Sequence, residues 1–291
     1  MSSKSLAPTA PVARFAESLE DATSGTVLYV DARGQARPSE QYRRRVVLGV
    51  GGAAVAMGVY TAALSYAGGP IGFVVAGVFN LLVVRNLAAW RTLYRATVLQ
   101  VARQNGEAET LLVRLVGRRL TPYRIKANAE QALARIAVMR GRYDQALVLQ
   151  SSAVRRLSKD RRARSRRRII EYERVVTLIN LGQIAEARRR FDGLPRALEG
   201  DYLRVQRTIA ELYLCFGENR HGFDPAFLDE QADIALGLRS APALLVLLAW
   251  AQVFAGHDRR AAELLTLARE RSGQEQMRKV YPRVCTWMNA F

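Results

Sequence analysis

The residues best suited to chemistry are clustered between positions 158 and 168, where the sequence reads SKDRRARSRRR. Six arginines and one lysine surround a single aspartate, so this segment can contact phosphate or carboxylate groups. Basic residues near an anionic membrane contribute about 1 kcal/mol each, which favours phospholipid headgroups or an acidic protein as partner. The alternative is a solvated loop or helix end. The candidate residues are Lys159, Arg161, Arg162, Arg164, Arg166, Arg167 and Arg168.

Nucleic acid is a less favoured partner of this basic segment. DNA and RNA bind basic residues through their phosphates, and the formal charge of +18 would suit them. Proteins that hold single strands also stack bases on aromatic side chains, and residues 158–168 contain none. Binding to DNA or RNA by a membrane-tethered chain therefore stays an alternative.

The sequence contains no pattern that indicates catalysis. The two histidines, His221 and His257, each lie beside a glycine. The two cysteines, Cys215 and Cys285, are far apart, so no Cys/His spacing predicts zinc, and we expect both to be buried and reduced. We therefore predict a protein that is not an enzyme and has no cofactor or metal.

A segment without charge precedes this basic cluster. Residues 46–84 contain no charged side chain. A helix needs about 20 mostly apolar residues to cross a bilayer, so residues 46–67 and 70–90 are each long enough. Gly68 and Gly69 suit a tight reversal between them, and Pro70 suits the start of the second helix. The sequence thus predicts a two-helix transmembrane hairpin over residues 43–90.

The arginines that flank the hairpin predict its orientation. Arg43–Arg45 precede the first span, Arg85 and Arg91 lie at the end of the second, and the reversal carries no charge. Because basic residues stay on the cytoplasmic side, we expect a multi-pass protein of the inner (plasma) membrane with both termini in the cytoplasm. The high use of arginine and alanine is typical of a bacterium with a GC-rich genome.

Small residues recur at a spacing of four along both spans. Such residues let helices approach closely in lipid, so they are expected either to pack the two spans together or to mediate self-association. Asn80 lies near the middle of the membrane, and we expect it to form a hydrogen bond with Thr61 or Tyr60 of the first span. The residues assigned to hairpin packing are Ala54, Gly58, Ala62, Gly68, Gly72, Ala76 and Asn80.

The remaining chain shows helical periodicity with an internal repeat. Glycines at positions 106, 141, 182, 217 and 256 are predicted to mark turns within five helix pairs, and residues 158–168 to form an extended connection between two of them. Before the first turn, the second span is expected to continue as a helix that packs through Leu87, Trp90, Tyr94, Val98 and Val101.

The strongest copies resemble the tetratricopeptide repeat. Alanines follow three of the glycines by five residues, at Ala146, Ala187 and Ala261, and the segment GRYDQA carries the closest match. The resemblance covers residues 95–272 and implies an α-solenoid whose first helices line an inner groove. The groove residues that this implies are Asn128, Gln131, Arg135, Tyr172, Asn180, Arg204, Arg207 and Trp250.

The predicted fold is therefore all-α. It consists of a mostly loose tail over residues 1–42 with a possible short strand in residues 26–35, the hairpin over residues 43–90, and a cytoplasmic helical-repeat domain over residues 91–291. The apolar run 241–256 is expected to be a core helix rather than a third span. The C-terminal segment is expected to cap the solenoid, with Pro282 interrupting its helix.

This organisation predicts a membrane-anchored scaffold or adaptor. Amides, arginines and aromatic side chains in a helical groove can bind a segment of a cytoplasmic or membrane protein, and the arginines favour an acidic one. A structural subunit that forms homo-oligomers through the hairpin is the main alternative.

Overall fold

Nearly every residue that the structure describes is helical, as the apolar periodicity predicts. The computed structural model describes residues 29–30, 36–37, 39–195, 201–236, 242–271 and 274–290. The strands are β1 (Tyr29–Val30) and β2 (Ala36–Arg37), and the helices are α2 (Ser39–Val101), α3 (Asn105–Gly117), α4 (Tyr123–Met139), α5 (Tyr143–Leu157), η1 (Arg161–Ala163), α6 (Arg164–Asn180), α7 (Ile184–Asp192), α8 (Asp201–Glu218), α9 (Pro225–Leu236), α10 (Pro242–Phe254), α11 (Asp258–Glu270), α12 (Gln274–Val280) and α13 (Pro282–Ala290).

The two strands form one short antiparallel pair, in which Tyr29 pairs with Arg37 and Val30 with Ala36. β1 lies inside the stretch 26–35 that the sequence predicts as a possible strand. Residues 1–28 and 31–35 lie outside the described residues.

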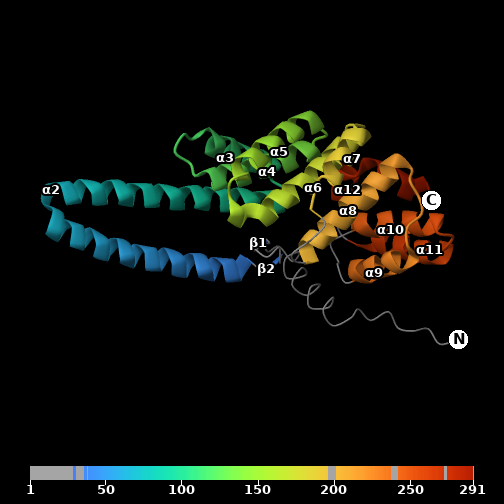
Figure 1. Cartoon of the computed structure of the whole chain (residues 1–291), viewed down its shortest axis with the longest axis horizontal. Helices are drawn as coiled ribbons and strands as arrows, with labels where there is room; N and C mark the ends of the chain where they lie inside the picture. The colour runs from blue at the N-terminus through green and yellow to red at the C-terminus, as the bar shows by residue number, and fades with distance from the viewer. Residues whose placement is uncertain are drawn as a thin grey trace.

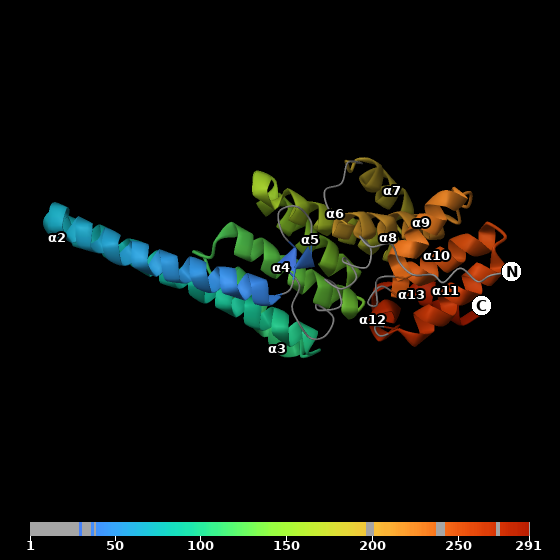
Figure 2. The ribbon, with the colours of Figure 1, turned by 90° about the horizontal axis from the view of Figure 1, so that it is seen from below.

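Helix α2 is a hairpin of two long arms rather than one straight rod (Figures 1 and 2). Gly69 breaks it, with φ 53° and ψ −142°, a conformation that glycine adopts readily because it has no Cβ. The arms lie side by side: Asn80 Nδ2 donates a hydrogen bond to Thr61 Oγ1 over 3.2 Å, and the rings of Tyr60 and Phe79 are 5.9 Å apart. The expected hydrogen bond of Asn80 is thus present.

The second arm continues without a break into the helical domain and ends at Val101. The continuation is as predicted, and Trp90 of the predicted face packs against the buried cluster, but Tyr94 and Val98 of that face do not. Ala89, Leu93 and Ala96 are buried against α3 and α4, whereas Tyr94 and Val98 are exposed. Because Ala89 and Ala96 are small, α3 can pack closely against this side of α2. The buried face of α2 is therefore not the face that carries the largest apolar side chains.

Five turns of the same geometry divide the domain into successive helix pairs. Each has a residue with positive φ, at Arg103, Gly141, Gly182, Asn219 or Gly256. In each, the next backbone N–H donates to the carbonyl five residues earlier, for example Arg142 to Ala137 and His257 to Gln252. This is the Schellman bond that commonly ends a helix. The arrangement is compatible with a helical-repeat solenoid.

The turn assignment from the sequence is confirmed at Gly141, Gly182 and Gly256 and wrong at Gly106 and Gly217. Gly106 lies within α3 and Gly217 within α8. The true turn residues there are Arg103 and Asn219, which adopt positive φ although they are not glycine. The first of these turns shows that the end of α2 and α3 form the first pair of the array.

The expected small contact five residues after each turn is present in four units. Ala108, Ala146, Ala187 and Ala261 are all fully buried, and each backbone N–H bonds to the carbonyl four residues earlier. Ala108 follows the turn residue Arg103 by five residues. The sequence pattern did not identify Ala108 because it placed this turn at Gly106. The unit that begins after Asn219 lacks this alanine.

The apolar run that resembled a third span is a core helix, as predicted. Residues Pro242–Gln252 of α10 are all buried, and α10 packs against α8, α9, α11 and α13. Cys215 and Cys285 are buried in the same core, as expected for packing cysteines. Gly217 has a different role from a turn: a Cβ there would lie 3.1 Å from Ile184 Cδ1.

The C-terminal helices both cap the array and reach back across it. The chain restarts at Pro282 after α12 ends at Val280, as the proline predicted. α13 packs on α10, and Arg269 Nη2 donates to the carbonyl of Met288 over 3.0 Å. α12 instead contacts α4, and Glu275 pairs with Arg103 at 2.7 Å. The C-terminal segment thus joins the last helix pair to the first two pairs.

Candidate partner-binding surfaces

The predicted groove residues on α4 form a polar cluster with α6. Gln131 Nε2 donates to both carboxylate oxygens of Glu173, at 3.0 and 3.1 Å, and Arg135 Nη2 approaches the same carboxylate at 2.6 Å. Gln131 is buried, whereas the side chain of Arg135 is 49% exposed. The negative charge of Glu173 raises the pKa of Arg135, so this guanidinium stays charged. Its outer edge remains available to a partner.

Two predicted groove residues, Asn128 and Asn180, hold other parts of the chain. Asn128 Oδ1 accepts a hydrogen bond from Arg166 Nε at 3.1 Å. Asn180 accepts from Tyr213 Oη at 2.5 Å and donates to the carbonyl of Val280 at 2.8 Å. The amide of Asn180 is therefore used by the returning C-terminal segment. Such a contact between distant residues leaves no signal in the local sequence.

The other four predicted groove residues divide between core and surface. Tyr172 and Trp250 are buried, and burial raises the pKa of Tyr172. Trp250 packs edge-on against Phe216, with the ring centroids 5.3 Å apart. Arg204 is exposed on α8, and Arg207 lies over the ring of Phe191 at 5.4 Å. In this structure Arg135 and Arg204 remain exposed, and Asn128 is half-buried. Arg207 is only 19% exposed and lies 3.8 Å from Glu211.

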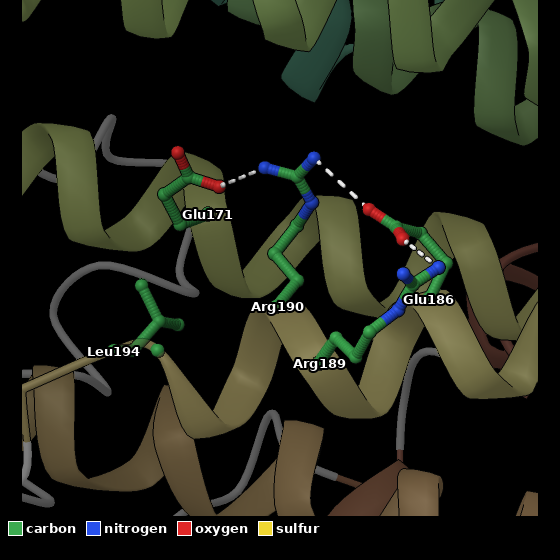
Figure 3. Close-up of a pocket in the computed structure, with 6 residues that line it drawn as sticks. Glu171, Glu186, Arg189, Arg190 and Leu194 are labelled. Atoms are coloured by element: carbon green, nitrogen blue, oxygen red, sulfur yellow. Dashed lines mark hydrogen bonds and ion pairs between the residues drawn. The ribbon is translucent and has the colours of Figure 1, made fainter.

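A shallow pocket between α6 and α7 is lined by alternating charges, a feature that the sequence did not reveal (Figure 3). Arg190 projects between Glu171 and Glu186, at 3.6 and 3.3 Å, and Glu186 also pairs with Arg189 at 2.7 Å. Arg174 lies behind Glu171 at 3.0 Å, and burial lowers the pKa of Arg174. Because each charge faces an opposite one, the pocket attaches α7 to α6 and provides no free acid, base or nucleophile.

The basic segment forms a compact turn instead of the extended connection that we expected. Asp160 caps η1 by accepting a hydrogen bond from the backbone of Arg162 at 3.0 Å. Its carboxylate also accepts from Arg124 Nη2 at 2.9 Å and from Tyr123 Oη at 3.1 Å. Burial alone would raise the pKa of Asp160, but the hydrogen bonds from Arg124 and Tyr123 outweigh it and lower that pKa. The single acid of the segment is thus fully engaged.

The seven predicted basic residues separate into two sets. Arg166 and Arg167 are half-buried and hold the chain, the latter by donating to the carbonyl of Ser158 at 3.0 Å, and Arg168 is half-buried beside them. The exposed set is Lys159, Arg161, Arg162 and Arg164.

The residues assigned to hairpin packing also divide by arm. Gly72 and Ala76 on the second arm are buried, whereas Gly58 and Ala62 on the first arm are exposed. Ala54 and Gly68 lie outside the residues whose surroundings the structure describes. The small residues of the second arm thus face the first arm, while those of the first arm face outward.

No group of three or more His, Cys, Asp or Glu side chains within the described part of the chain could hold a metal ion. Comparison with protein-family models, with curated proteins and with solved structures gives no match.

Proposed function

We propose that this chain is a membrane-anchored cytoplasmic scaffold. A two-span hairpin holds a tetratricopeptide-like helical array at the inner face of the membrane, and the array binds a partner protein. The observation that carries the proposal is a contrast along α2. Its large apolar side chains are exposed from Ile71, which is 77% exposed, to Val84, whereas from Ala89 onward one face, formed by Ala89, Leu93 and Ala96, is buried in the array.

The exposed part of α2 has the length and composition of a membrane span. Within the described part of the chain, Ile71–Gln100 is the single segment that meets both criteria. Water would penalise so large an apolar surface, and lipid removes the penalty. The first arm supports a second span because three of its own large apolar or aromatic side chains, Val55, Val59 and Tyr66, are also exposed. Its flanking arginines support the cytoplasmic position of both termini.

The accessible arginines support an acidic partner for the array. Arg135 lies on α4 and Arg204 lies on α8, so they come from first helices of different pairs. Guanidinium groups bind carboxylates through paired hydrogen bonds and are frequent in binding hot spots. A short acidic segment of a cytoplasmic or membrane protein suits this surface.

Photo-crosslinking in membranes tests the scaffold. A benzophenone amino acid at Arg204 in the full-length protein is expected to capture one defined partner. The same amino acid at Ala262, an exposed position on α11, is the matched control. Substitution of Arg135 by glutamine should reduce the adduct at least tenfold. An adduct of equal yield at positions 204 and 262 would contradict the proposed surface.

A structural subunit of an oligomeric membrane assembly is the second candidate. It is favoured by the outward position of Gly58 and Ala62, a small-residue pair that the hairpin itself does not use. Close helix packing in lipid depends on such pairs. Under this alternative, Ala62→Cys should form a disulfide-linked dimer in native membranes, and Ala63→Cys on the same arm should not.

A further inference from the structure

Two connections of the array lie at the end from which the hairpin projects (Figures 1 and 2). They are the α3–α4 connection at residues 118–122 and the α5–α6 connection at residues 158–163. α3 runs back along α2 for 13 residues, about 20 Å at 1.5 Å per residue. Leu115 near its end shares a buried cluster with Ala89. The α3–α4 connection therefore lies near the level at which the apolar arm enters the domain.

Asp160 joins these two connections into one surface. Its carboxylate accepts hydrogen bonds from Tyr123 Oη at 3.1 Å and Arg124 Nη2 at 2.9 Å, both at the start of α4. It also accepts from the backbone of Arg162 in η1 at 3.0 Å. The side chain of Asp160 is only 5% exposed, so it acts as a buried link between two loops 36 residues apart.

The joined surface is strongly basic and also carries two exposed side chains with apolar groups. Leu120 is 62% exposed and Tyr123 is 47% exposed. Six basic residues lie in or directly beside the same two connections, all exposed, and none forms an ion pair with any described residue. These are Arg118, Arg119, Lys159, Arg161, Arg162 and Arg164.

We propose that residues 118–124 and 158–164 form one membrane-contact surface that lies on the anionic headgroups of the bilayer that holds the hairpin. The basic side chains contact lipid phosphates, and Leu120 and Tyr123 enter the interface, where apolar and aromatic side chains are favoured. This inference rests on the proposed membrane anchor. It adds a second contact with the membrane, which fixes the orientation of the array.

The position of the surface favours a membrane over other anionic partners. The continuous α2 helix holds the array at a set distance from the hydrocarbon layer, so the surface is presented to headgroups without further motion. Arg85, which is exposed on α2, lies just before the level of Ala89 and marks the same plane. Exposed leucine beside arginine suits an interface that is part water and part lipid.

Fluorescence quenching in nanodiscs tests the surface on the full-length protein. Leu120→Cys is labelled with bimane and reconstituted into discs of phosphatidylcholine, with or without 30% phosphatidylglycerol, that contain doxyl-labelled lipid. The native cysteines are buried, and labelling of the parent protein measures their background. Quenching at position 120 in anionic discs should exceed that at Ala262→Cys on α11 at least threefold.

A charge-matched pair of variants separates this surface from general attraction. Replacing Arg161, Arg162 and Arg164 by glutamine should reduce the quenching at position 120 at least twofold in anionic discs. The control replaces three exposed arginines elsewhere by glutamine and should leave it unchanged. The control residues are Arg142, Arg259 and Arg278.

The outcomes distinguish the anchor from the surface. A bimane at Val78→Cys, on the exposed face of the second arm, should be quenched in both disc types. No quenching at Val78 would overturn the anchor. Quenching at Val78 with equal signals at positions 120 and 262 would overturn the surface alone. A change in emission at position 120 caused by RNA, without any effect of phosphatidylglycerol, would assign the surface to nucleic acid and reject the membrane contact.

Discussion

Five carboxylates of the described residues join neighbouring helices of the array. Each of the five acids faces an arginine 26 to 38 residues away, and the distances that join their oxygens to the guanidinium nitrogens lie within hydrogen-bonding range. Since acids are scarce in this chain, their pairing leaves the excess arginines free on the surface. The pairs are Glu109–Arg140, Glu130–Arg156, Asp160–Arg124, Glu173–Arg135 and Glu218–Arg188.

The Glu218–Arg188 pair predicts a pH dependence of stability. Arg188 Nε donates to Glu218 Oε1 at 2.7 Å, and these hydrogen bonds lower the pKa of Glu218 against the effect of burial. A lowered folded-state pKa adds stability above the unfolded-state pKa of about 4.3, and this stability is lost as pH falls further. Glu218→Gln should therefore lower the free energy of unfolding by about 1–3 kcal/mol at pH 7.

Thermal unfolding in detergent from pH 7 to pH 3 measures this effect. The difference in Tm between the parent protein and Glu218→Gln should shrink as pH falls below about 4. Glu263→Gln is the matched control, since Glu263 pairs with Arg259 at an exposed site where such pairs contribute about 0.2–1 kcal/mol. A Tm difference for Glu218→Gln that stays constant down to pH 3 would contradict the assignment.

The turns between paired helices depend on backbone conformation more than on residue type. Gly256 has φ +76°, whereas Gly106 lies in a regular helix, and a Cβ added at either would meet no atom within 4 Å. Gly256→Ala should therefore destabilise the chain by about 1–2 kcal/mol through strain. Gly106→Ala should be neutral or stabilise by up to about 1 kcal/mol, because alanine favours a helix.

Comparison of these two alanine variants by thermal unfolding isolates the conformational effect. Both variants add the same methyl group in open space, so a contact cannot explain a difference between them. Equal changes in Tm at positions 106 and 256 would show that the turn geometry at Gly256 is not required. Arg103 and Asn219 adopt the same conformation without glycine, which indicates that packing of the flanking helices can offset this strain.

The whole chain is predicted to place its reversal outside and its array inside the cell. Transfer of the arginine-rich array across the membrane is opposed by its charge, while the reversal near Gly69 carries none. Tyr66→Cys, at a residue that is almost fully exposed beside the reversal, should react with a membrane-impermeant thiol reagent in intact cells. Ala262→Cys should react only after lysis. Reaction of Ala262→Cys in intact cells would reject the proposed topology.

The returning C-terminal segment influences the array as a whole. α12 contacts α4, and Val280 accepts a hydrogen bond from Asn180, so residues 100 positions apart meet. This segment occupies part of the inner surface that the repeat resemblance assigned to a partner. Partner binding is consequently proposed for the arginines that stay accessible, on α4 and α8.

Features that depend on neighbouring residues could be read from the sequence. The charge-free residues 46–84, the helix restart at Pro282, the core helix α10 and the turns at Gly141, Gly182 and Gly256 each follow from local composition or backbone preference. The physical reason is that hydrophobic length and φ preference are properties of a short segment.

Features that depend on residues far apart in the chain required the folded arrangement. The contact of Asp160 with Tyr123 and Arg124, the burial of Gln131 beside Glu173 and the return of α12 to α4 each join segments that no local pattern connects. Helix packing also explains why the turns fall at Arg103 and Asn219. The intrinsic preference of these two residues for positive φ is weak, and the energy of packing the flanking helices exceeds it.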